Sequence, residues 1–236
     1  MKNMLITGAS RGLGAAFNQG IADAGDSLWL VSRGKPFTSA ADGIHRHWIA
    51  ADLSDLNAAQ HIRQALGETR LDALVYNAGI WETSAFSSRY DLTRVSIEET
   101  VRVLTVNLTS AITTISALLP NLRQSANAKI ILIGSINGLE NNPSPEVAYG
   151  ASKFGLRGVA HSLREHLRQD SISVTCINPG TISTEVPYEA GVEAALRQAP
   201  GAIPVHDLVQ VVRCVLSLSA GSSIKEIDIP GMADAI

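Results

Sequence analysis

Tyr149 and Lys153 have the types and the spacing of a proton-transferring pair. They lie in the sequence Tyr-Gly-Ala-Ser-Lys at the start of a helical pattern over 149–169, and a separation of four residues places both side chains on one helix face. A free phenol has a pKa of about 10, so a tyrosine that exchanges protons near neutral pH needs a nearby cation. We expect Lys153 to be that cation, although such pairs are often only surface neighbours.

Two further polar residues are candidates for the same chemistry. Ser135 follows an apolar run at 129–134, where its hydroxyl could donate to a substrate oxygen that gains negative charge. Asn107 interrupts an apolar helical pattern over 96–123. It either faces solvent and bonds its own backbone, or it is buried and must be paired.

A glycine-rich turn follows the first apolar run at 2–7. Its glycines are Gly8, Gly12 and Gly14, in the sequence Thr-Gly-Ala-Ser-Arg-Gly-Leu-Gly. Glycines at a strand-to-helix turn let backbone amides approach a phosphate at the helix N-terminus. The alternative is a plain helix-entry turn. We predict that the turn binds a dinucleotide through Gly8, Ser10, Arg11, Gly12, Leu13 and Gly14.

The second apolar run, 27–32, ends in Ser32-Arg33 and carries no acid at its exit. Sites for unphosphorylated dinucleotides usually place a carboxylate there to bind the ribose 2′-hydroxyl. Asp26 precedes the run and is expected to be a turn residue. Arg33 and Arg11 could instead bind a 2′-phosphate, although a single arginine is usually a solvated charge. The sequence therefore favours NADP(H) over NAD(H).

Polar or small residues also follow the other apolar runs. Asp52-Leu53 could contact the adenine, or Asp52 or Ser54 could cap a helix at 55–67. The small residues of Asn77-Ala78-Gly79 would let a ligand lie against the backbone, and Pro179-Gly180 follow the sixth run. Six such exits at one edge of a sheet predict one long ligand crevice.

These residues must be positioned by alternating strands and helices. Strand-length runs occur at 2–7, 27–32, 46–51, 72–76, 129–134, 172–177 and 224–229, and helical patterns at 12–24, 55–67, 96–123, 149–169 and 206–219. This alternation predicts an α/β fold, a doubly wound parallel sheet with helices on both faces, in a single domain over 1–236. The connection over 33–45 is too short for a full crossover helix, so we expect a reduced or irregular element there.

Composition excludes several classes of protein. The 236 residues are 45% hydrophobic and 17% charged, with a net charge of −3 and two cysteines. These values are typical of a globular protein and not of a disordered chain or a disulfide framework. We expect no metal site, no nucleic-acid partner and no membrane span. A small-molecule substrate and a cytoplasmic location are the expectations that remain.

Taken together, the motifs resemble those of the short-chain dehydrogenase/reductase family over residues 1 to about 185. They are Thr-Gly-x-x-x-Gly-x-Gly at 7–14, Asn-Ala-Gly at 77–79, Asn107, Ser135, Tyr-x-x-x-Lys at 149–153, and Pro179-Gly180 followed by Thr184. The resemblance implies a Rossmann-type fold with Tyr149 as general acid/base. It also implies that Lys153 binds the nicotinamide ribose, Ser135 polarises the carbonyl and Asn107 anchors a water, while Ile182 and Thr184 hold the carboxamide.

The resemblance further implies a homodimer or homotetramer built through the helices at 96–123 and 149–169. The sequence departs from the family pattern at two places. The 33–45 segment is shorter than in most members, and the chain has Ile-Pro-Gly-Met at 229–232 where many members have Asp-Gly-Gly. A short substrate lid is expected near 185–204. We expect Ile136 and Tyr188 to contact the substrate, with Leu139, Trp81 and Phe86 as further apolar walls.

The function expected from these residues is NADPH-dependent, reversible reduction of a small ketone or aldehyde. The alternative is a non-catalytic NADP(H)-binding regulatory or interaction protein. Such a protein would have no need to keep Asn107, Ser135, Tyr149 and Lys153 together.

Overall fold

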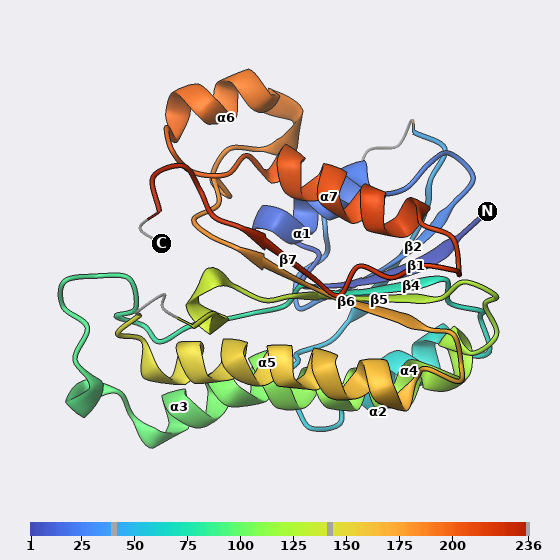
Figure 1. The fold of residues 1–236 in the computed structure, drawn as a ribbon, viewed down its shortest axis with the longest axis horizontal. Helices are drawn as coiled ribbons and strands as arrows, with labels where there is room; N and C mark the ends of the chain where they lie inside the picture. The colour runs from blue at the N-terminus through green and yellow to red at the C-terminus, as the bar shows by residue number, and fades with distance from the viewer. Residues whose placement is uncertain (39–41, 141–143, 235–236) are drawn as a thin grey trace.

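The computed structural model describes residues 1–38, 42–140 and 144–234, and alternates strands with helices along this part of the chain (Figure 1). Seven strands pair in parallel in the order β3-β2-β1-β4-β5-β6-β7. Their bounds are β1 (Asn3–Thr7), β2 (Ser27–Ser32), β3 (His45–Ala50), β4 (Ala73–Tyr76), β5 (Lys129–Ile133), β6 (Ser173–Pro179) and β7 (Glu226–Ile229). The predicted doubly wound parallel sheet is confirmed.

Helices cover both faces of this sheet (Figure 1). On one face lie α1 (Gly12–Gly20) and α7 (Val205–Ser217), with the short α6 (Val192–Gln198) beyond them; on the other lie α2 (Ala58–Leu66), α3 (Ile97–Leu104), α4 (Ser110–Leu122) and α5 (Val147–His166). Single turns occur at η1 (Leu92–Arg94), η3 (Ile136–Gly138) and η4 (Tyr188–Ala190).

Alternation along the strands divides the core into two layers. In β1, Leu5 packs in the layer beneath α2, α4 and α5, whereas Met4 and Ile6 pack in the layer beneath α1 and α7. Successive side chains of a strand point to opposite faces, and a parallel sheet covered on both sides buries both. This explains why the strands read as continuous apolar runs.

The predicted helix over 96–123 is interrupted by a π-helical turn, η2 (Thr105–Thr109), between α3 and α4. The π-turn disturbs the regular backbone ladder, and the buried Tyr76 hydroxyl donates to the carbonyl oxygen of Val106 at 2.7 Å. Asn107 lies within this turn and is 1% exposed. The sequence pattern could not show the interruption, because the apolar residues continue through it.

The same segment corrects the expectation that no stretch of the chain is long enough to span a membrane. Ile97–Leu122 covers 26 residues with a mean hydropathy of 1.5 in its most apolar window, which is 44% buried. By length and composition alone it passes that test. Its side chains Ala111, Ile115, Leu118 and Leu122 pack in the core, which accounts for its apolar composition.

The segment between β2 and β3 contains no helix among its described residues, 33–38 and 42–44, as expected. Arg46 ties it to α1: its guanidinium pairs with Asp42 at 2.6 Å and donates to the Asn18 side chain at 2.8 Å. Residues 39–41 of the predicted irregular segment lie outside the described residues. Asp26 accepts from the backbone N–H of Lys2, and thus is a turn residue where the strands begin.

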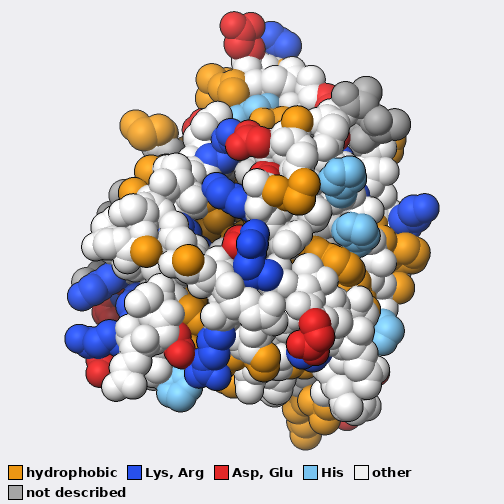
Figure 2. Space-filling model, turned by 90° about the vertical axis from the view of Figure 1, so that its right-hand side faces the viewer, with side chains coloured by type: hydrophobic (Ala, Val, Ile, Leu, Met, Phe, Trp, Pro, Cys, Tyr) orange, Lys and Arg blue, Asp and Glu red, His pale blue; other side chains and the backbone are white. Residues whose placement is uncertain are grey.

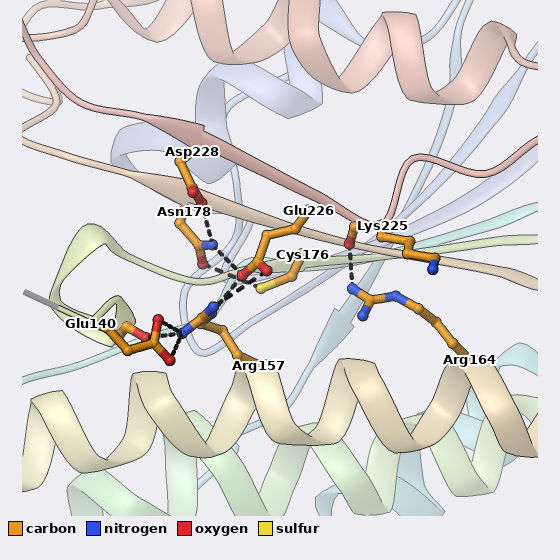
Figure 3. A network of polar contacts seen from close by, with 9 residues as sticks. Glu140, Arg157, Arg164, Cys176, Asn178, Lys225, Glu226 and Asp228 are labelled. Carbon is orange, nitrogen blue, oxygen red and sulfur yellow. Dashed lines mark hydrogen bonds and ion pairs between the residues drawn. The ribbon is translucent and has the colours of Figure 1, made fainter.

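A polar network fastens α5 to the last two strands (Figure 3). Arg157 of α5 bonds Glu226 of β7 at 2.5 Å and the carbonyl oxygen of Gly138 at 2.8 Å. Asn178 of β6 donates to Glu226 and Asp228 at 2.7 and 2.8 Å. The helix that carries Tyr149 and Lys153 is thereby held in register with the sheet.

The side of the molecule on which the N-terminus lies carries mixed charge. Basic and acidic side chains are interspersed there with isolated apolar ones and histidines (Figure 2). The ligand site described next lies at the other end of the strands.

Candidate active site

One cleft of about 1040 Å³ runs along the carboxyl ends of the strands. It lies where the strand order reverses, since β1 pairs with both β2 and β4, and this switch point is where open α/β sheets bind ligands. Residues after five predicted strand exits line it, in the order Gly8, Arg33, Asp52, Asn77 and Ser135, and Pro179 and Gly180 supply a sixth. The predicted crevice is therefore present.

The glycine turn forms one wall of the cleft. Gly8 and Gly12 have φ values of +69° and +53°, which favour glycine. A Cβ on Gly14 would lie 2.0 Å from the carbonyl oxygen of Gly8, so Gly14 lets α1 approach the turn. Arg11 caps α1 without a side-chain bond to its first N–H groups, which remain available to a phosphate. Gly14 itself does not line the cleft, whereas Ser10, Gly12 and Leu13 do.

Basic side chains gather at the β2 end of the cleft. Arg11, Arg33 and Arg102 of α3 line it, and all three side chains are exposed. Ser32 also lines it, with its hydroxyl donating to the carbonyl oxygen of Gly34. A guanidinium pair of this kind suits a phosphate monoester. Arg102 was not predicted from the sequence, since it lies mid-pattern in a helix.

The residues after β3 and β4 also line the cleft. Asp52 accepts from the N–H of Ser54 at 3.0 Å. This bond is the main cause that lowers the pKa of Asp52, and the charges of Arg33 and Arg102 lower it further. The interpretation of Asp52 or Ser54 as a helix cap is wrong, because α2 begins at Ala58 after Asn57. Leu53, Asn77, Ala78 and Gly79 line the cleft as predicted.

Tyr149 and Ser135 meet near the middle of the cleft, which both line. Burial raises the pKa of Tyr149 above its ordinary value, a hydrogen bond with Ser135 lowers it, and the carboxylates of Glu146 and Glu82 raise it. The net direction is upward. Tyr149 is therefore protonated near neutral pH and can act as a proton donor.

Lys153 lies beside Tyr149 as the spacing predicts, with Nζ 5.5 Å from the tyrosine ring centre. Its ammonium donates to the carbonyl oxygen of Ile133 at 3.0 Å, and burial lowers the pKa of Lys153 to about 8. Burial raises the pKa of Tyr149 and the Ser135 hydroxyl is the group that lowers it, so the expectation that Lys153 lowers this pKa is not met.

Asn107 is buried and fully paired, and does not line the cleft. Its Oδ1 accepts from the N–H of Ile80 at 2.8 Å, and its Nδ2 donates to the carbonyl oxygen of Ile80 at 2.7 Å and to the Ser152 hydroxyl at 2.9 Å. The solvent-facing alternative is wrong. Asn107 joins the segment after β4 to the helix of Tyr149, which makes it a positioning residue in this structure.

The far end of the cleft is built by the segment after β6. Pro179, Gly180, Ile182 and Thr184 line it, and Thr184 lies against Gly12, where an added Cβ would be 3.4 Å away. Asp234 near the C-terminus accepts from the N–H and hydroxyl of Thr181 at 3.0 and 2.7 Å. The sequence analysis missed Asp234, which holds this segment in place.

The structure corrects one predicted substrate contact. Tyr188 stacks on His206 of α7, with ring centres 4.5 Å apart, and its hydroxyl lies against Gly20 of α1. It packs on the core layer beneath those helices instead of lining the cleft. Leu139 does not line the cleft either, whereas Ile136, Trp81 and Phe86 do.

Two buried glutamates near Tyr149 were also missed. Glu82 is 0% exposed and accepts from the N–H groups of Ala148 and Tyr149 at the start of α5. Glu146 is 3% exposed and lines the cleft. Neither lies in a motif, and their burial depends on loops whose course the sequence pattern does not predict.

The family model for short chain dehydrogenases matches residues 2–193 of this chain. The chain belongs to the short-chain dehydrogenase/reductase family. It is an NAD(P)-dependent oxidoreductase of Rossmann-type fold.

Among curated relatives of this dehydrogenase, the rhamnolipids biosynthesis 3-oxoacyl-[acyl-carrier-protein] reductase of Pseudomonas aeruginosa is 35% identical over 189 residues, covering 75% of this chain and 71% of its own length. Carbonyl reductase family member 4 of Danio rerio is 29% identical over 202 residues, covering 83% and 82%. The Pseudomonas aeruginosa RhlG/NADP complex matches with a TM-score of 0.77 at 28% identity, covering 98% and 95%.

Proposed function

We propose that this dehydrogenase reduces a small ketone or aldehyde with NADPH, reversibly. The observation that carries the proposal is the convergence of Ser135, Tyr149 and Lys153 on one cleft, whose β2 end is lined by Arg11 and Arg33. The solved complexes of relatives with NADP are consistent with it.

The cleft fits such a cofactor by its own residues. The glycine turn and the open first turn of α1 would hold the pyrophosphate, Arg11 and Arg33 the 2′-phosphate, and Lys153 the nicotinamide ribose. Ile182 and Thr184 would hold the carboxamide. When bound, NADPH supplies the hydride that reduces the carbonyl carbon.

Each catalytic side chain then has a defined task. The Ser135 hydroxyl donates a hydrogen bond to the substrate oxygen. Tyr149 gives its proton to that oxygen, because its raised pKa keeps the phenol protonated near neutral pH. One carbonyl compound, one NADPH and one proton become one alcohol and one NADP⁺, and the proton on Tyr149 is restored from solvent.

The experiment that tests this function has two steps. Thermal unfolding is first measured with NADPH and with NADH at equal concentration, since a ligand that binds the folded state more tightly raises the unfolding midpoint more. A panel of ketones, aldehydes and quinones is then offered with the preferred cofactor. We expect NADPH to stabilise more and to be oxidised; tight NADPH binding without turnover of any carbonyl compound would instead indicate a non-catalytic NADP(H)-binding protein.

We also propose that the chain forms a homodimer or homotetramer through α3, α4 and α5. Large apolar side chains on these helices are exposed. Monomeric proteins rarely expose contiguous apolar patches of this kind. The exposed side chains are Ile97, Val101, Ile112, Val147 and Phe154.

A further inference from the structure

Three aromatic side chains form a corner at the substrate end of the cleft. The rings of Trp81, Phe86 and Tyr149 all line it, with ring centres 5.6, 6.3 and 5.3 Å apart and interplanar angles of 73°, 87° and 87°. The three ring planes are nearly perpendicular to one another, so their faces can surround a small group from three sides. Trp81 and Phe86 are 56% and 55% exposed, so much of their surface is free to contact a ligand.

A buried carboxylate lies at this corner. Glu146 Oε1 accepts from the N–H of Phe86 at 2.8 Å, and Oε2 accepts from the Ser144 hydroxyl. Ser144 in turn accepts from Asn137 Nδ2 at 2.8 Å, so its own proton is directed to Glu146. Both carboxylate oxygens therefore have donors, the arrangement of an ionised group.

A second carboxylate stands behind the corner. Glu82, next to Trp81 in the chain, uses Oε1 to accept from Ala148, Tyr149 and the Tyr90 hydroxyl. Its Oε2 is buried without a hydrogen-bond partner among the described residues. A buried polar atom without a partner is costly.

The arginines that line the cleft lie at one end of it. Arg11, Arg33 and Arg102, with the carboxylate of Asp52 beside them, lie at the β2 end, whereas Glu146 lies with the aromatic rings. The Lys153 ammonium lies 5.5 Å from the centre of the Tyr149 ring and donates to the carbonyl oxygen of Ile133. The carboxylate of Glu146 lines the cleft beside these rings, so the corner attracts positive charge and repels anions.

Backbone strain at Phe86 points to the same corner. Phe86 has φ of +59°, a conformation that is costly for a large side chain. The hydrogen bond from its N–H to Glu146 helps to hold it. Strain of this kind gathers at ligand sites, where the surrounding contacts fix a side chain in a required place.

We propose that the substrate is a carbonyl compound that carries a tertiary or quaternary ammonium group, which binds between Trp81 and Phe86 beside Glu146. This substrate class rests on the proposed carbonyl reduction. Aromatic faces attract cations, and quaternary ammonium ligands are recognised by aromatic cages. A carboxylate beside the rings adds charge attraction. A bound cation also offsets the negative charge next to Tyr149, which favours the ionised phenol after its proton has left.

The test compares three ketones of similar shape with NADPH. They are 2-(trimethylammonio)acetophenone, its neutral tert-butyl isostere 3,3-dimethyl-1-phenylbutan-1-one, and the anionic 3-benzoylpropionate. We expect kcat/KM for the cation to exceed that for the neutral isostere by about 10-fold, as a cation–π contact beside a buried carboxylate permits. The anion should be the poorest substrate.

Variants assign that preference to the corner. Glu146→Gln keeps an oxygen that can accept from the Phe86 N–H, places a donor where Ser144 now donates to Oε2, and removes the charge. Trp81→Leu keeps an apolar side chain but removes the aromatic face. Each should reduce the cation-to-neutral ratio about fivefold, mainly through KM of the cation. Glu68→Gln, an exposed acid in the turn after α2 and outside the cleft, is the matched control and should leave the ratio unchanged.

A binding measurement separates this proposal from the proposed function. Calorimetric titration of phenyltrimethylammonium into the NADP⁺ complex needs no turnover, and should show binding that Glu146→Gln weakens. Turnover of the neutral ketone without any cation preference would overturn the substrate class and leave carbonyl reduction standing. If no ketone or aldehyde is reduced, carbonyl reduction fails; the calorimetry then still decides the cation site, and absence of binding overturns it.

Discussion

Lys153 is buried beside Tyr149, with its ammonium bonded to the carbonyl oxygen of Ile133. Burial disfavours the charged form, which lowers the pKa of Lys153 to about 8. The side chain is therefore cationic below pH 8 and loses its proton as the pH rises through that value.

This lowered pKa predicts a pH dependence of cofactor binding. Since a charged Lys153 would donate to the nicotinamide ribose, we expect the dissociation constant of NADPH to rise about 10-fold between pH 7 and pH 9.5. Lys153→Met should bind NADPH more weakly at pH 7 and show no such rise. Fluorescence titration across this range measures both proteins, and an identical rise in Lys153→Met would assign the titration to another group.

The two arginines at the β2 end predict cofactor preference. Arg33→Ala should weaken NADPH binding by about 10- to 100-fold and leave NADH binding nearly unchanged, because a charge-assisted hydrogen bond to the 2′-phosphate is lost. Lys35→Ala removes an exposed cation two residues away that does not line the cleft, and should alter neither. If Arg33→Ala weakened the binding of NADPH and NADH equally, Arg33 would not bind the 2′-phosphate.

At the scale of elements, the segment from α3 to α4 shows which structural features a sequence pattern predicts and which it does not. Its apolar periodicity predicts a helix, and the structure has one. The π-turn inside it depends on contacts from another element, the Tyr76 hydroxyl of β4 and the Ile80 backbone. The motif therefore singled out Asn107, but the sequence could not show the bonds to Ile80 and Ser152 that bury it outside the lining of the cleft.

The π-turn gives a prediction about stability. Tyr76→Phe removes the donor to the carbonyl oxygen of Val106, which is buried, and should lower the free energy of unfolding by about 1–3 kcal/mol. Chemical denaturation measures the loss, and Tyr90→Phe, which removes a hydroxyl nearer the surface, should cost less. A Tyr76→Phe protein as stable as the wild type would mean that the π-turn does not depend on that bond.

Dependence on contacts between distant elements also decides which site residues could be predicted from the sequence. Glycine turns and strand exits were predictable, because parallel strands must end at one edge of the sheet and their exits must meet there. Tyr188, Glu82 and Glu146 lie in irregular segments without periodicity. Their placement against α1, α5 and α7 follows from tertiary packing that no local pattern encodes.

At the scale of the whole molecule, the exposed apolar side chains of α3, α4 and α5 predict self-association. Phe154 on α5 is 44% exposed, and Phe154→Glu should shift the molar mass in light scattering from an oligomer toward a monomer, because a buried unpaired charge opposes association. Leu196→Glu, on α6 and 53% exposed in the wild type, is the matched control. A monomeric wild type would contradict the proposed assembly.

The whole account depends on proton transfer from Tyr149 to a carbonyl oxygen in the cleft. Its most direct test is the turnover of Tyr149→Phe on the best ketone of the panel, with NADPH binding measured in parallel by thermal unfolding. Tyr188→Phe, which alters a tyrosine outside the cleft, serves as the control and should keep its activity. We predict that Tyr149→Phe binds NADPH normally and loses about 10²- to 10⁴-fold in kcat, whereas turnover within twofold of the wild type would contradict the assignment.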